Sequence, residues 1–221
     1  MATESRRARE MLDALRAELM PGGQTPPNRF IALLTKGAVP RERLAWLAAE
    51  QHHIINSDQR SFSALATRFP QAPAGPFFLG LAQGEIAALD LLPALIDKTG
   101  PRDLAAYVPK PLAQTYPHFL AWCALSAPAS AVAMAMAANL EVWGSYCSAT
   151  GAALRGSYGL GTEAVAFFDF FSTPPDGFTE QAVDVAQAGL DGGEEPETAV
   201  RTARAMQAYE LAFWDALAEG L

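Results

Sequence analysis

Residues 208–215 read Ala208-Tyr209-Glu210-Leu211-Ala212-Phe213-Trp214-Asp215 and have the apolar period of an α-helix. The helical neighbours of Glu210 at i−7, i−4, i+3, i+4 and i+7 are all apolar: Ala203, Met206, Phe213, Trp214 and Leu217. A helix that buries these side chains also carries the Glu210 carboxyl group inward. A buried carboxyl group is costly unless it is paired, hydrogen-bonded or protonated. The pattern therefore indicates a functional group or, alternatively, a glutamate at the edge of the stripe that reaches solvent.

The same helical period recurs along nearly the whole chain, and no segment alternates in the manner of a β-strand. Glycine and proline residues separate the predicted helices. These helices cover approximately residues 5–19, 28–35, 40–68, 77–98, 112–126, 129–154, 162–171, 173–189 and 197–219, with a short piece at 101–107. No shift in composition marks a domain boundary. We therefore expect one all-α domain over residues 1–221, a bundle of about eight helices, with an N-terminal helix and connector over residues 1–27.

The composition argues against several classes of protein. The chain has 221 residues, of which 50% are hydrophobic, and this is enough for one substantial core. Its formal net charge is −8 and it has no basic stripe, so we expect no nucleic-acid partner. Residues 1–6 lack an apolar signal core, and no apolar run reaches the length of about 18 residues typical of a membrane helix. Cys123 and Cys147 form no CxxC pair and lie in apolar segments, which predicts buried free thiols in a cytoplasmic protein without a membrane partner.

Two motifs, one in each half of the chain, carry a family resemblance. The first is Arg29-Phe30-Ile31-Ala32-Leu33-Leu34-Thr35-Lys36-Gly37-Ala38-Val39-Pro40-Arg41-Glu42-Arg43-Leu44, in which one helix ends at a Gly-x-hydrophobic-Pro turn and a long helix follows. The second is Tyr209-Glu210-x-x-Phe213-Trp214. Both motifs, the helix order and the chain length resemble the TenA/PqqC group. The resemblance implies a haem-oxygenase-like all-α fold, an enclosed pocket for a small-molecule substrate, and a homodimer or homotetramer.

The group includes thiamin-salvage hydrolases, whose pocket residues can be compared with this sequence position by position. Glu210 and Tyr116 match pocket positions of those enzymes. Ala138 stands where they have a nucleophilic cysteine, and Gln51 stands where they have an acidic residue. Because a methyl group cannot act as a nucleophile, we do not expect thiamin hydrolysis by that mechanism.

The group also includes non-haem di-iron oxidases, which bind iron through carboxylates and histidines. Three carboxylates of that pattern are present: Glu85, Glu141 and Asp176. The histidine positions hold Leu92, Ser172 and Thr179, and Pro174-Pro175 interrupts the ligand helix. Because such iron sites need imidazole nitrogens, we expect no metal at these residues. Iron held with a histidine from elsewhere, such as His52 or His53, is the alternative.

The three carboxylates differ in their surroundings. Glu85 shares its helical stripe with Leu81, Leu89, Leu92 and Ile96, which predicts burial. The neighbours of Glu141 are mostly small, and this suits either a helix crossing or a cavity wall. Asp176 completes a Thr-x-x-Asp pattern with Thr173, which favours a helix-capping box over a place in the pocket.

The histidines and aromatic residues supply further candidates. Glu50 and His53 at i, i+3 mimic a metal-binding motif, although their helical face looks exposed to solvent. His52 lies on a more apolar face and is expected to reach the pocket. Tyr116 and His118 begin a helix near the expected mouth, where His118 is alternatively a solvated residue. The rings of Phe167, Phe168, Phe170 and Phe171 are expected to divide between core and pocket.

Together these observations predict an enzyme that acts on a flat, partly apolar metabolite by acid–base catalysis, without metal or cofactor. The expected catalytic residues are Glu210, Glu85 and Glu141. The expected substrate contacts are Gln51, His52, Tyr116, His118, Phe171, Asp176 and Trp214. The reaction would be a condensation, cyclisation or oxidation in specialised, natural-product biosynthesis. An iron oxygenase with an atypical ligand set, and a ligand-binding or regulatory protein without catalysis, are the alternatives.

Overall fold

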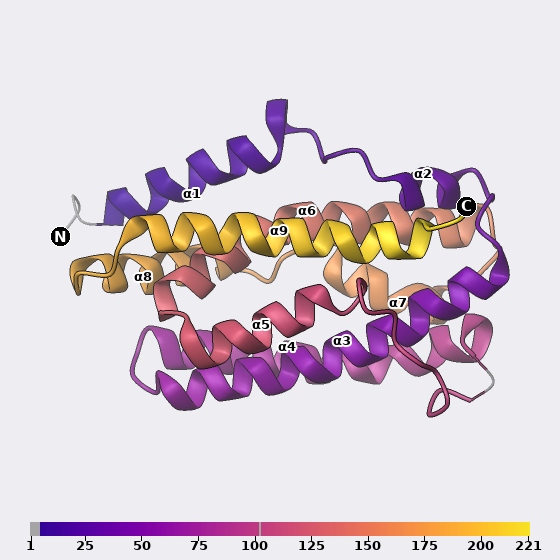
Figure 1. Ribbon diagram of the computed structural model, residues 1–221, viewed down its shortest axis with the longest axis horizontal. Helices are drawn as coiled ribbons and strands as arrows, with labels where there is room; N and C mark the ends of the chain where they lie inside the picture. Colours follow the sequence, from indigo (N-terminus) through magenta and orange to yellow (C-terminus); the bar gives the residue numbers. More distant parts are fainter. Residues whose placement is uncertain (1–4, 102) are drawn as a thin grey trace.

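The computed structural model describes residues 5–101 and 103–221 and consists of helices joined by short connections (Figure 1). The helices are α1 (Ser5–Leu19), η1 (Pro21–Gly23, a 3-10 turn), α2 (Arg29–Thr35), α3 (Arg41–Arg68), α4 (Ala74–Thr99), α5 (Thr115–Ser126), α6 (Ala129–Gly156), α7 (Thr162–Phe171), α8 (Phe178–Asp191) and α9 (Pro196–Ala218). Within the described ranges there is no β-strand, and the α-helices number nine. The prediction of an all-α bundle is confirmed.

Most helix ends follow from local sequence. The side chain of Asn28 accepts a hydrogen bond from the backbone N–H of Ile31 at 3.0 Å and so caps the start of α2. Gly37, with a φ of 67°, allows the left-handed turn that separates α2 from α3. Residues 103–107, which belong to the short piece expected at 101–107, form no helix, and α5 begins three residues later than expected.

The start of α8 differs from the prediction. We expected a helix from about Thr173, with Asp176 in a capping box, but α8 begins at Phe178 and no side chain caps it. Pro174 and Pro175 lack backbone N–H groups and disfavour helical geometry in the residues before them. The chain turns instead at Gly177, which has a φ of 72°, and Asp176 remains in the connection between α7 and α8.

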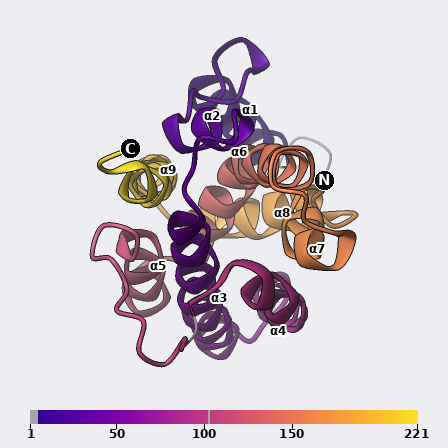
Figure 2. The same cartoon turned by 90° about the vertical axis from the view of Figure 1, so that its right-hand side faces the viewer.

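Six helices form a closed ring in which each packs against the next: α3, α4, α7, α6, α9, α5 and again α3. Figure 2 shows this arrangement approximately end-on, with α9 and α5 on one side and α7 and α4 on the other. The helix α6 is buried along almost all of residues 129–139, where alanine predominates. Small side chains let neighbouring helices approach closely, so α6 contacts α1, α2 and α8 as well as its ring neighbours.

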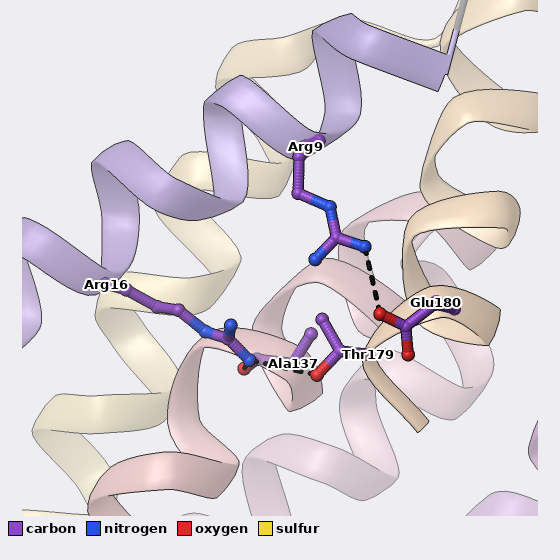
Figure 3. Close-up of polar contacts among 5 residues, drawn as sticks. All are labelled: Arg9, Arg16, Ala137, Thr179 and Glu180. Atoms are coloured by element: carbon purple, nitrogen blue, oxygen red, sulfur yellow. Dashed lines mark hydrogen bonds and ion pairs between the residues drawn. The ribbon is translucent and has the colours of Figure 1, made fainter. Parts of the chain in front are cut away.

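The N-terminal helix and connector lie outside the ring, and α1 packs on α6 and α8 (Figures 1 and 3). The guanidinium group of Arg16 donates hydrogen bonds to the carbonyl oxygen of Ala137 at 3.1 Å and to Thr179 Oγ1 at 3.2 Å. Arg9 forms a more exposed ion pair with Glu180 at 3.3 Å. Residues 1–4 of the expected N-terminal unit lie outside the described residues.

The cysteine prediction is confirmed, since Cys123 and Cys147 are both buried free thiols. Among the described residues, α4 is the one helix whose length and composition would allow it to cross a membrane. This helix is a member of the ring, and it carries Glu85 near its middle.

Candidate functional site

A cavity of about 450 Å³ lies among the ring helices and α8. Its walls are largely apolar, with aromatic side chains at Phe77, Trp143, Phe170, Phe171, Phe178 and Phe213. Residues 173–176, all exposed, form one side of its mouth. The buried polar residues that line it are Gln51, Asp58, Glu85, Asn139 and Glu210, together with the half-buried Tyr116. This combination of apolar walls and a few convergent polar groups is typical of a small-molecule site.

Glu210 on α9 is buried, with 3% of its surface exposed, as its helical neighbours predict. The side-chain amide of Asn139 on α6 donates a hydrogen bond to Glu210 Oε2. Burial raises the pKa of the Glu210 carboxyl to about 8, although polar interactions with Asn139 and Trp214 oppose the shift. The carboxyl group therefore titrates close to neutral pH.

A second acidic centre consists of Asp58 on α3 and Glu85 on α4, which we call the Asp58–Glu85 pair. Burial raises the pKa of both carboxyl groups well above the usual range, and the negative charge of Asp58 raises that of Glu85 further. A hydrogen bond with the Tyr116 hydroxyl opposes the shift at Asp58. Among the described residues, Asp58 Oδ1 and Glu85 Oε2 have no hydrogen-bond partner.

The hydroxyl of Tyr116 on α5 joins the two acidic centres. Its pKa is raised by burial and then by the charges of Asp58, Glu85 and Glu210. All three carboxyl groups line the same cavity as the phenol. The cavity thus holds three buried carboxyl groups and one neutral hydroxyl.

The structure brings six of the predicted site residues to the cavity and leaves four outside it. Those that line the cavity are Glu210, Glu85, Gln51, Tyr116, Phe171 and Asp176. Those that do not are Glu141, His52, His118 and Trp214. Of the phenylalanines on α7, Phe167 and Phe168 lie in the core, whereas Phe170 and Phe171 reach the cavity.

The four predicted residues that do not line the cavity have contacts elsewhere in the protein. The Glu141 side chain is 52% exposed and forms an ion pair with Arg16 at 3.6 Å on the outside of the bundle. The imidazole of His52 lies near the amide of Asn56 on the same helix, and His118 is exposed. Trp214 is buried behind Glu210, and its ring packs against those of Phe213, Tyr146, Trp143 and Phe30 at centroid distances of 4.9 to 5.9 Å.

The expected exposure of Glu50 is also wrong, because the connection between α4 and α5 covers it. Glu50 is completely buried and accepts hydrogen bonds from the hydroxyl of Tyr107 and the backbone N–H of Lys110, both at 2.7 Å. The side-chain amide of Gln114 donates to its other oxygen. Each carboxylate oxygen of Glu50 accepts at least one hydrogen bond from the protein, so this side chain holds the α4–α5 connection in place and has no unpartnered oxygen for a ligand.

Asp58 is the one buried acidic residue of the cavity that was not expected from the sequence. Its helical neighbours Ile54, Phe62 and Leu65 are apolar, but Gln51 at i−7 and Ser61 at i+3 are polar. Helical periodicity therefore indicates burial less clearly for Asp58 than for Glu210.

The cavity does not fit the di-iron pattern. Of the three expected carboxylates, Glu85 is deep in the cavity, Asp176 is at its mouth and Glu141 is outside it. No histidine lines the cavity, and the described residues contain no group of three or more His, Cys, Asp or Glu side chains arranged to hold a metal ion. Burial raises the pKa of the Cys147 thiol, which keeps that sulfur protonated and unreactive behind the site.

Comparison with known proteins agrees with the architecture. A search of curated proteins gives no match. Among solved structures, a domain with a heme oxygenase-like fold from Shewanella denitrificans has a TM-score of 0.68 at 15% identity, covering 97% of this chain and 90% of the other. A TenA homologue from P. horikoshii gives 0.67 at 12% identity, covering 97% of both chains. A protein described as a TenA family transcription regulator, from Silicibacter, gives 0.68 at 17% identity and covers 98% and 99%.

At these identities the likeness to solved structures establishes the haem-oxygenase-like fold. The family model described as TENA/THI-4/PQQC matches residues 29–220, which include both motifs of the sequence resemblance. The chain therefore belongs to the TENA/THI-4/PQQC family.

Proposed function

We propose that the chain is a small-molecule enzyme that uses the carboxyl groups of its cavity for acid–base catalysis without a metal. The observation that carries this proposal is that Asp58, Glu85, Glu210 and Tyr116 line one largely apolar cavity, in which the charge of each carboxyl group raises the pKa of the Tyr116 hydroxyl. Perturbed carboxyl groups in an enclosed cavity are typical of sites that transfer protons.

Each group has a distinct part in the proposed chemistry. Glu210, with a pKa of about 8, gives up or takes a proton near neutral pH at little cost. The Asp58–Glu85 pair holds a second proton, and the Tyr116 hydroxyl stays neutral and so can donate one hydrogen bond while it accepts another. Neither polar atom of the Gln51 amide has a hydrogen-bond partner among the described residues, so both can bind substrate.

The aromatic walls suit a flat, partly apolar substrate. Ala138 replaces the family's cysteine nucleophile, and this is consistent with a condensation, cyclisation or oxidation in specialised biosynthesis.

We further propose a cytoplasmic homodimer or homotetramer. Trp122 and Leu125 on α5 support association, since 54% and 78% of their surfaces are exposed. Light scattering of the purified protein measures the oligomeric state directly.

The catalytic proposal is tested by incubating the purified protein with a metabolite extract and following consumption by mass spectrometry. We expect at least one compound to be consumed by the wild type but not by Glu210→Gln or Glu85→Gln, both of which should keep their helical circular dichroism. The matched control is Glu141→Gln, which removes an acidic group outside the cavity and should leave consumption unchanged. Full activity in both cavity variants would contradict the proposal.

The two alternative functions give different results in the same preparation. Stoichiometric iron in protein expressed with added iron, detected by elemental analysis, would favour an oxygenase with an atypical ligand set. Retention of one metabolite without turnover would favour a ligand-binding or regulatory protein.

A further inference from the structure

The ionisable side chains that line the cavity include acids but no bases. Four acidic residues line it, which are Asp58, Glu85, Asp176 and Glu210, and none of the lining residues is lysine, arginine or histidine. A bound anion would meet like charge with no cationic partner, which costs affinity. A neutral molecule would form hydrogen bonds with these groups but would give their ionised forms no counter-charge.

The buried carboxyl groups of the cavity are less completely hydrogen-bonded than Glu50, which has three donors. Glu210 has the amide of Asn139 on one oxygen and no partner among the described residues on the other. Asp58 and Glu85 are 3% and 8% exposed, yet Asp58 Oδ1 and Glu85 Oε2 have no partner among the described residues. A buried acceptor without a donor is destabilising, so these two oxygens are in place for a donor from outside the protein.

From these contacts we propose that the cavity binds a protonated primary or secondary amine, with the Asp58–Glu85 pair as its counter-charge. The proposal deepens the proposed function by naming the substrate class. An ammonium group has several N–H donors and can serve Asp58 Oδ1 and Glu85 Oε2 at once. The rings of Phe77, Trp143, Phe171 and Phe213 surround the remaining space and suit an aromatic or other apolar body beside the cation.

Binding of such a cation is coupled to a proton. In the free protein burial raises the pKa of both carboxyl groups, so the pair holds a proton that must leave when it pairs with an ammonium ion. The other groups that face the pair are Tyr116 from α5, Glu210 from α9 and Asp176 at the mouth, while α6 and α8 present the uncharged amides of Asn139 and Gln181. None of these supplies a positive charge, so affinity for the amine rises with pH until the pair is ionised.

The test uses 2-phenylethylamine, its neutral isostere 2-phenylethanol and the anion 3-phenylpropionate, with the full chain, by calorimetry and ligand-observed NMR. We expect the amine to bind about tenfold or more tightly than the alcohol, a difference of about 1.4 kcal/mol, and the anion not to bind. Affinity for the amine should rise by up to about tenfold per pH unit, and calorimetry in two buffers should detect the released proton.

Matched variants identify the site. The double variant Asp58→Asn and Glu85→Gln keeps the shape of both side chains and should abolish the preference for the amine. Asp90→Asn removes a charge from an exposed position on the same helix as Glu85, away from the cavity, and should leave the preference intact. Equal binding of amine and alcohol, preferential binding of the anion, or an unchanged preference in the double variant would overturn the proposal.

These outcomes separate the inference from the catalytic proposal on which it rests. Amine binding without consumption of any metabolite leaves the inference standing and contradicts catalysis. Consumption of a substrate that is anionic or neutral at the working pH supports catalysis and contradicts the inference.

Discussion

At the scale of single residues, Glu210 links the chemistry of the cavity to the stability of the fold. Its pKa is about 8 in the folded protein and close to 4.5, the ordinary value for a glutamate, when the chain is unfolded. Between these values the folded state holds a proton that the unfolded state has lost, so this group's stabilising contribution is complete below pH 4.5 and is lost as pH rises towards 8.

The first prediction concerns Glu210→Gln, in which an amide replaces the protonated acid. Relative to the wild type, the variant should gain free energy of unfolding by up to about 1.4 kcal/mol per pH unit between those two pKa values. Urea unfolding at a series of pH values measures the difference. A constant difference across this range would show that the Glu210 carboxyl keeps an ordinary pKa.

The second prediction concerns two glycines of α4. Gly84 lines the cavity, and an added Cβ atom would meet no heavy atom within 4 Å. Because alanine loses less backbone entropy than glycine when a helix forms, Gly84→Ala should stabilise the fold by about 0.5–1 kcal/mol. At Gly75 the added atom would lie 2.7 Å from the carbonyl carbon of Pro70, so Gly75→Ala should destabilise it. Thermal unfolding measures both, and equal shifts would contradict the prediction.

Helical periodicity predicts burial well where one stripe of a helix is apolar and the rest is polar. Glu210 and Glu85 satisfy this condition, whereas the stripe of Asp58 includes the polar residues Gln51 and Ser61 and indicates burial less clearly. Glu141 does not, because the preceding part of α6 is buried on every side and its sequence cannot indicate which face meets the cavity. That choice depends on the placement of α1, whose Arg16 pairs with Glu141 outside the ring.

At the scale of helices, α1 braces the wall of the cavity from outside. Arg16 bonds to Ala137, which lies between the lining residues Met136 and Asn139, and to Thr179, which follows the lining residue Phe178 (Figure 3). One side chain therefore connects α1 to both α6 and α8.

The third prediction compares Arg16→Met with Arg9→Met, since methionine keeps most of the apolar stem in each. Loss of the charged hydrogen bonds of Arg16, whose side chain is 26% exposed, should cost about 1.5–3 kcal/mol of unfolding free energy. The ion pair of Arg9 with Glu180 is more exposed, at 37% and 67%, and its loss should cost less than about 0.5 kcal/mol. Urea unfolding distinguishes the two, and similar costs would mean that α1 is held mainly by its apolar face.

The helices themselves could be predicted from sequence, whereas the connections could not. The helices predicted at residues 5–19 and 162–171 have the same bounds as α1 and α7, because glycine, proline and the apolar period mark their ends in the sequence. The connection over residues 100–114 has no period, and nothing in its sequence indicates that it folds over α3 to bury Glu50. The expected exposure of Glu50 is therefore wrong, although α3 itself is predicted correctly.

At the scale of the whole molecule, the helix ring encloses a cavity whose buried acidic groups lower the free energy of unfolding. The period of each helix predicts a buried face but not the ring, which follows from how the helices pack and from the family resemblance. The Asp58–Glu85 pair places in this cavity two acidic groups, each with one oxygen that has no hydrogen-bond partner in the part of the chain that the structure describes. Apolar residues of similar volume would satisfy the surrounding packing without that cost.

The last prediction follows from this conflict between stability and function. The double variant Asp58→Leu and Glu85→Met should raise the free energy of unfolding at neutral pH by about 1–3 kcal/mol, because the removal of two buried carboxyl groups, each with one oxygen that lacks a donor among the described residues, outweighs the loss of the single hydrogen bond between Asp58 and Tyr116. Glu50→Met is the matched contrast, since it should lower that free energy by about 2–5 kcal/mol by leaving three buried donors unpaired. Urea unfolding measures both. If the double variant is destabilised as much as Glu50→Met, the pair belongs to the structural core; if it is stabilised while amine binding is lost, the fold retains these acids for their ligand.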